Sequence, residues 1–71
     1  MANEDAISLA LQLAYEYENP GWEHIEDMLA CYEDEDPPCD GDDLNDLMTQ
    51  GLKLKAEGKT FQEAHKELCK A

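Results

Sequence analysis

Residues 22–32, WEHIEDMLACY, carry the clearest helical pattern in the sequence. Their apolar side chains recur at spacings of three and four, which is the period of an α-helix with one apolar face. The predicted inner face consists of five residues: Trp22, Ile25, Met28, Leu29 and Tyr32. The predicted outer face consists of three acidic residues: Glu23, Glu26 and Asp27. The pattern therefore indicates a helix with a core side and a strongly acidic solvent side.

The segments on either side of this helix are predicted to break the chain. We expect Asn19 to be the N-cap, Pro20 to be the first helical residue, and the helix to run to about Glu33. Residues 33–43 combine two prolines and one glycine with seven acidic side chains. Because the fixed φ of proline and the repulsion of like charges both disfavour a helix, an extended loop is expected there.

A preceding helix, which starts at Glu4 after Asn3 as its cap, is apolar around much of its circumference. One stripe contains Ile7, Leu11 and Ala14, and further apolar residues lie beside it: Ala6, Leu9, Ala10, Leu13, Tyr15 and Tyr17. An arc this broad is more than one neighbouring helix covers. Two interpretations follow: the helix is the centre of its bundle, or its surplus face packs against a second copy of the chain.

Two more helices are predicted in the last part of the chain. The third starts near Asp42 and has this inner face: Leu44, Leu47, Met48, Gly51 and Leu52. A glycine inside a helix is destabilising by about 1 kcal/mol relative to alanine, so we expect another backbone to approach closely at Gly51. Gly58 is expected just beyond the end of this helix. Thr60 and Glu63 have the spacing of a capping box, which opens a fourth helix with this inner side: Phe61, Ala64, His65 and Leu68.

Together these elements predict one small all-α domain over residues 1–71, a compact bundle of four short helices with an acidic Pro/Asp loop between the second and third. Leu, Ile, Val and Phe make up only 12 of 71 residues and the net charge is −13, a combination typical of disordered chains. The periodic faces, with their Trp, Tyr and Met residues, favour a folded domain. No membrane-spanning run or secretory signal is recognised, so a cytoplasmic protein is expected.

Charge is distributed unevenly along the chain. Residues 1–52 carry fifteen carboxylates and no Lys or Arg, whereas residues 53–71 carry five lysines and three glutamates. Solubility of a small domain needs a net charge of only about 2–8, and a larger excess destabilises the compact state by self-repulsion. We therefore expect the acidic surface to bind a basic partner protein, and neither a nucleic acid directly nor a membrane. The residues expected to form that surface are Glu23, Glu26, Asp27, Glu33, Asp34, Glu35, Asp36, Asp40, Asp42, Asp43 and Asp46.

Metal and redox chemistry find little support in the sequence. If Gly41 takes the glycine position of an EF-hand loop, Pro38 and Leu47 fall where calcium ligands are needed. The three cysteines lack the close spacing of a structural zinc site, and no cofactor or catalytic residue is expected. A disulfide between Cys31 and Cys39 stays open as an alternative, and with it a calcium- or redox-responsive switch as the least favoured function.

Two resemblances bear on function. Residues 52–64, LKLKAEGKTFQEA, resemble the first helix and turn of recombinase-type or sigma-type helix-turn-helix modules, but no room for a recognition helix follows, so DNA binding is not inferred. In size, acidity and lack of arginine the chain looks similar to phage and mobile-element proteins that inhibit host nucleic-acid enzymes, including anti-restriction and anti-CRISPR inhibitors. That resemblance implies a non-enzymatic inhibitor or nucleic-acid mimic. The alternative is a helical adaptor or homodimeric regulator that acts through the apolar face of the first helix.

Overall fold

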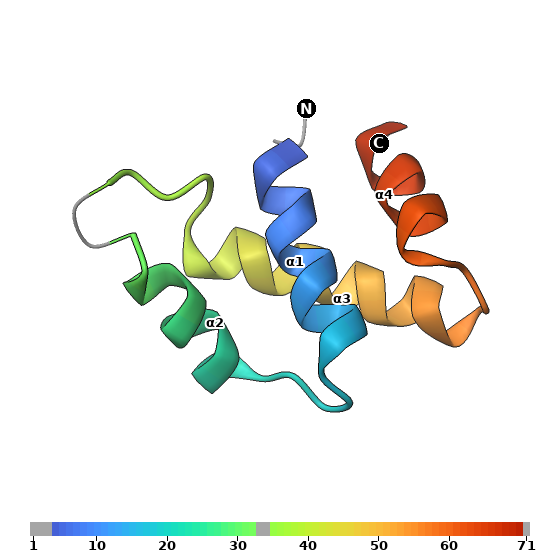
Figure 1. Ribbon diagram of the computed structural model, residues 1–71, viewed down its shortest axis with the longest axis horizontal. Coiled ribbons are helices and arrows are strands. Elements are labelled where there is room, and N and C mark those ends of the chain that lie inside the picture. Colours follow the sequence, from blue (N-terminus) through green and yellow to red (C-terminus); the bar gives the residue numbers. More distant parts are fainter. Residues whose placement is uncertain (1–3, 33–34, 71) are drawn as a thin grey trace.

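The computed structural model describes residues 4–32 and 35–70, which form four α-helices and no strand. The helices are α1 (Glu4–Glu16), α2 (Trp22–Ala30), α3 (Gly41–Ala56) and α4 (Phe61–Lys70). α1 crosses α3, while α2 and α4 lie at opposite ends of the molecule (Figure 1). The predicted all-α fold of four helices is therefore confirmed. None of the helices in the described part of the chain is long and apolar enough to cross a membrane.

α1 is the central helix. Its buried residues are Ala6, Ile7, Ala10, Leu11, Leu13 and Ala14. One part of this surface packs with Ile25 of α2 and with Leu44 and Met48 of α3, and another part packs with Ala64 and Leu68 of α4. Most of the apolar arc is thus covered within a single chain, as the central-helix interpretation predicts, but Leu9 and Tyr15 are half-buried and Tyr17 is exposed. Self-association stays a prediction, and the cap at Asn3 lies outside the described residues.

α1 and α3 pack closely at Gly51. A Cβ atom placed on this glycine would lie 2.8 Å from Cδ2 of Leu11 and 3.1 Å from Cβ of Ala14. The expected close approach at Gly51 is confirmed, although the atoms that occupy the space belong to side chains of α1 rather than to its backbone. A hydrogen in place of a side chain is what lets the two helices cross here.

α3 ends as its sequence predicts. Gly58 has a φ of +90°, a conformation that glycine adopts without steric strain. Its N–H donates to the carbonyl of Lys55, and the N–H of Lys59 donates to the carbonyl of Leu54, both at 3.0 Å. These two bonds make up a Schellman motif, which satisfies carbonyls at the end of α3.

α4 opens with the predicted capping box. The N–H of Glu63 donates to Oγ1 of Thr60 at 3.2 Å, and the N–H of Thr60 donates to Oε1 of Glu63 at 3.0 Å. The segment that resembles part of a helix-turn-helix module therefore folds as the junction of two consecutive helices, α3 and α4. Local hydrogen bonds at the helix ends account for the presence of Gly58, Thr60 and Glu63 in this segment.

α2 differs most from expectation. It begins at Trp22 and not at Pro20, and its N-cap is Gly21, so the prediction that Asn19 caps it is wrong. The N–H of Gly21 donates to Nδ1 of His24 at 3.1 Å, while its carbonyl accepts from the amides of His24 and Ile25. A histidine three residues into the helix therefore takes the place of the expected cap, and the helix ends at Ala30 rather than near Glu33.

The predicted inner face of α2 is only partly buried. Ile25 is fully buried, and Met28, Leu29 and Tyr32 are half-buried. Trp22 is 50% exposed, so the prediction that it is a core residue is wrong. Its ring meets the start of α3, where a Cβ atom on Gly41 would lie 3.2 Å from Cζ3 of Trp22.

Candidate functional site

The outer face of α2 is acidic, as predicted. Glu23, Glu26 and Asp27 are all exposed, while Ile25 on the opposite side joins the core formed by α1 and α3. The three carboxylates are spaced by three and four residues, so they lie on one side of the helix. Packing of Ile25 therefore turns these carboxylates toward solvent.

The loop after α2 and the first turns of α3 lie at the same end of the molecule as α2 (Figure 1). Their exposed carboxylates are Glu35, Asp36, Asp40, Asp42, Asp43 and Asp46, whereas Glu33 and Asp34 lie outside the described residues. Asp40 also has a structural role, because its Oδ1 accepts the N–H of Asp43 at 2.8 Å and caps α3. Carboxylates at this helix start also suit the positive end of its dipole. We call the exposed set the acidic end: Glu23, Glu26, Asp27, Glu35, Asp36, Asp40, Asp42, Asp43 and Asp46.

The lysines lie at the other end of the molecule. Lys53 and Lys55 are in the last turn of α3, and the remaining lysines follow on the turn and on α4: Lys59, Lys66 and Lys70. α3 has 16 residues and so spans about 24 Å. It runs along the long dimension of a molecule that measures 35 × 26 × 16 Å, with α2 near its start and α4 near its end (Figure 1). Charge that is uneven in sequence is therefore separated in space.

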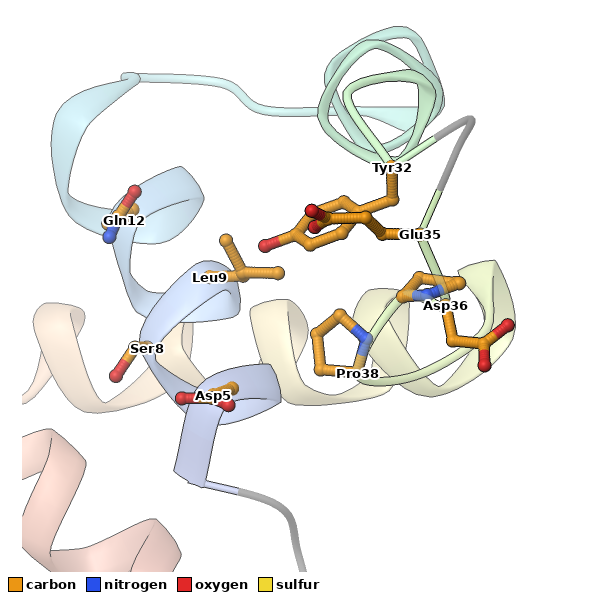
Figure 2. Close-up of a pocket in the computed structure, with 9 residues that line it drawn as sticks. Asp5, Ser8, Leu9, Gln12, Tyr32, Glu35, Asp36 and Pro38 are labelled. Carbon is orange, nitrogen blue, oxygen red and sulfur yellow. The ribbon is translucent and has the colours of Figure 1, made fainter.

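A cleft of about 620 Å³ opens between α1 and the loop that follows α2. Figure 2 shows Tyr32 and Glu35 reaching toward Leu9 of α1, with Pro38 closing another side. The α1 wall also contributes three polar side chains: Asp5, Ser8 and Gln12. The cleft combines carboxylates with apolar surface from Leu9 and Pro38, and it shares Glu35 and Asp36 with the acidic end. Its chemistry suits a cationic group with an aliphatic stem.

Among residues 4–32 and 35–70, the exposed large apolar side chains are Tyr17 at 43%, Trp22 at 50% and Phe61 at 36%. Trp22 lies on α2 near the carboxylates of the acidic end, and helical periodicity in the sequence did not predict its exposure. The signal that points to it is its place as the first residue of α2, since a helical side chain leans toward the preceding turn. A first-turn residue therefore extends past the end of its own helix, where fewer neighbours cover it.

A second, smaller groove of about 270 Å³ lies between the end of α1 and α2. The rings of Tyr17 and His24 flank it, with their centroids 4.4 Å apart, and Leu13, Met28 and Cys31 add apolar surface. His24 is engaged in capping α2 through its Nδ1 atom, which accounts for its position. The groove therefore follows the contact between α1 and α2 and is flanked by two aromatic rings.

The cysteines are free thiols. Sγ of Cys31 lies 3.6 Å from the carbonyl of Asp27, to which it donates. The pKa of Cys39 is raised, first by burial and then by the negative charges of Asp43 and Asp40. Among residues 4–32 and 35–70, no group of three His, Cys, Asp or Glu side chains is arranged to hold a metal ion.

His65 joins α4 to α1. Its Nε2 atom lies 3.2 Å from Oγ of Ser8, and its Nδ1 atom lies 3.5 Å from Sγ of Cys69. The imidazole also stacks on Phe61, with ring centroids 6.5 Å apart. The sequence predicts His65 on the inner side of α4, and it lies half-buried between α4 and α1, whereas Phe61, predicted on the same side, is exposed.

Comparison with known proteins finds no family model that matches the chain, and no curated protein or solved structure with significant similarity.

Proposed function

We propose that this chain is a non-enzymatic acidic domain that binds a basic surface of a nucleic-acid-binding protein or enzyme and inhibits or modulates it. The observation that carries the proposal is the acidic end. Its nine exposed carboxylates occupy a region in which the sequence has no lysine or arginine, while the five lysines gather on the opposite side. A surface of this kind attracts a cationic groove and orients the domain as it approaches.

The spacing of the carboxylates suits competition with nucleic acid. Duplex DNA carries about one negative charge per 1.7 Å of helix axis. On α2 the carboxylates of Glu23, Glu26 and Asp27 are separated by about 1.5 to 6 Å of helix rise, and the start of α3 adds Asp42, Asp43 and Asp46. Two adjacent helices thus present charge at a density of the same order as DNA. A partner that binds phosphates through Lys and Arg would bind these carboxylates in the same groove, and nucleic acid would be excluded.

The resemblance in size and acidity to phage anti-restriction and anti-CRISPR inhibitors supports the same proposal. Its natural setting is the cytoplasm of a bacterial or other host cell, where thiols such as Cys31 stay reduced. Inhibition then follows from occupancy: an acidic domain that fills a nucleic-acid groove needs no catalytic residue of its own.

The test is capture of partners by the tagged full-length chain from a bacterial lysate, at about 50 mM and about 500 mM salt, because exposed charge pairs are screened beyond about 8–10 Å near physiological salt. We expect basic proteins at low salt, their loss at high salt, and their release by added duplex DNA. If the amount of captured partner changes with neither salt nor added DNA, the proposal is contradicted and binding is assigned to an apolar face. A gel shift of DNA by the chain alone would also contradict it.

A matched pair of triple variants sharpens this test. One variant neutralises the acidic end on α2 with Glu23→Gln, Glu26→Gln and Asp27→Asn. The control removes the same charge from exposed positions elsewhere: Glu16→Gln, Glu57→Gln and Glu67→Gln. We expect the first to lose most of the salt-sensitive capture and the control to keep most of it. Equal losses would show that only net charge matters, and not its location.

A further inference from the structure

Trp22 stands out on the acidic end. It is the only tryptophan in the chain and is 50% exposed. One edge of its ring is held, because the indole lies over the start of α3 at Gly41. A large aromatic surface left in water is unfavourable unless a partner covers it, and tryptophan is among the residues that most often anchor protein interfaces.

Each of the two helices that meet at this ring carries an exposed carboxylate near the contact. Glu26 lies four residues after Trp22, which places it beside Trp22 on the surface of α2. Asp42 follows Gly41, the residue beneath the ring, and both carboxylates are exposed. No lysine or arginine occurs before residue 53 in the sequence to neutralise them locally. The ring is therefore an apolar platform in a negative field.

We infer that Trp22, with Glu26 and Asp42, binds an arginine side chain of the basic partner. The guanidinium stacks on the exposed indole face while its N–H groups donate to a neighbouring carboxylate. Arginine fits better than lysine, because its planar, weakly hydrated group stacks on aromatic rings and donates two parallel hydrogen bonds, whereas the ammonium of lysine is a compact and strongly hydrated charge. This inference rests on the proposed function and names its central contact.

The first test compares two peptides of equal charge, hexa-arginine and hexa-lysine, titrated into the full-length chain at low salt. Trp22 fluorescence reports binding directly, since no other tryptophan contributes. We expect hexa-arginine to change the emission saturably and to bind about two- to fivefold more tightly than hexa-lysine, the gain typical of an exposed cation–π contact. Equal affinities, or binding of hexa-arginine without any change in emission, would overturn the inference.

The second test uses Trp22→Leu, which keeps apolar volume but removes the aromatic face. Phe61→Leu is the control, because Phe61 is an exposed aromatic at the lysine-bearing end. With labelled peptides and anisotropy as the readout, we expect Trp22→Leu to lose the preference for arginine and Phe61→Leu to retain it. An unchanged preference in Trp22→Leu would contradict the inference. The comparison of peptides on the unmodified chain keeps the inference testable even where Trp22→Leu folds poorly.

The two proposals fail in different ways. If both peptides bind equally, and salt-sensitive partner capture persists, the acidic end is a docking surface and the role of Trp22 in arginine binding is refuted. If neither peptide binds, and capture from lysate ignores salt, both proposals are refuted.

Discussion

The two ends of the molecule are stabilised in different ways. The crossing of α1, α3 and α4 buries six residues of α1 alone and is fixed by directed bonds, such as the 2.7 Å hydrogen bond from the hydroxyl of Tyr15 to the carbonyl of Lys59. α2 buries only Ile25 completely. The carboxylates gather around α2, so the region with the fewest buried side chains also has the strongest repulsion between like charges. Binding surfaces are often drawn from such low-stability regions.

This contrast explains why the acidic end is suited to binding. Repulsion among its carboxylates is unfavourable in the free protein, and a cationic partner relieves it. The end of the molecule formed by the last turn of α3 and by α4 bears no such excess, because residues 53–71 carry five lysines and three glutamates. Four substitutions, taken from the largest expected effect to the smallest, test the comparison.

Leu11→Ala should have the largest effect. Leu11 is fully buried at the point where α1 crosses α3, and loss of such a side chain destabilises by about 2–5 kcal/mol. A domain of this size has a total stability of about 3–5 kcal/mol, so most of the helical far-UV circular dichroism signal should disappear. A variant that melts like the parent would show that the crossing is not the centre of stability.

Ile25→Ala should have a smaller and more local effect of about 2 kcal/mol. Its side chain is the one fully buried contact of α2, so the change should loosen α2 while α1 and α3 persist. Hydrogen exchange should accelerate for α2 amides and change little around Gly51. Uniform acceleration over the whole chain would mean that both ends unfold as one cooperative unit.

Trp22→Ala should destabilise by only about 1 kcal/mol, because about half of the ring is already in water. For a domain of this length that corresponds to a fall of about 5 °C in melting temperature. A thermal melt followed by circular dichroism measures it. Complete unfolding at 25 °C would show that Trp22 is a core residue after all.

Glu63→Gln should have the smallest effect, confined to pH dependence. Hydrogen bonding with Thr60, and secondarily the charge of Lys59, hold the pKa of Glu63 below its usual value of 4.5. A carboxyl with a depressed pKa in the folded state stabilises above its ordinary pKa, and that contribution is lost as pH falls through the folded-state value. Glutamine can still accept the bond from Thr60, so only the charge is removed. Urea unfolding should give the variant a slightly smaller free energy of unfolding at pH 7, and this difference should shrink as the pH falls below 4.5. A difference that does not change with pH would assign it to the cap geometry instead.

The parts that sequence reasoning predicted well are those fixed by near neighbours. Gly58, Thr60 and Glu63 act through hydrogen bonds to residues three to five positions away, and the structure reproduces each of them. The cap of α2 was predicted wrongly because more than one nearby residue can cap a helix. Asn19 and His24 both offer a local cap, and propensity favours asparagine, but the imidazole of His24 reaches the amide of Gly21.

The candidate site divides in the same way. The identity and exposure of Glu23, Glu26 and Asp27 follow from helical period, because acidic residues opposite an apolar stripe face water. How near these residues lie to Asp42 and Asp43 depends on where α2 packs. The sequence of the connecting segment, residues 33–43, does not determine that position. The cleft beside Leu9 likewise forms only when the loop after α2 lies against α1, so no sequence motif predicts it.

By itself, the sequence determined four helices, the residues that end α3 and cap α4, and the glycine where α1 and α3 cross. It also determined that the lysines all follow residue 52, after a segment whose charged residues are all acidic. Helical period, caps and charge are short-range properties, so a single chain segment carries them. The tertiary structure decided that six residues of α1 are buried against the other three helices, that the acidic end and the lysines lie at opposite ends of α3, and that Trp22 is left half in water. Burial and proximity depend on which helices meet, and that is settled only when the apolar faces of all four compete for the same small core.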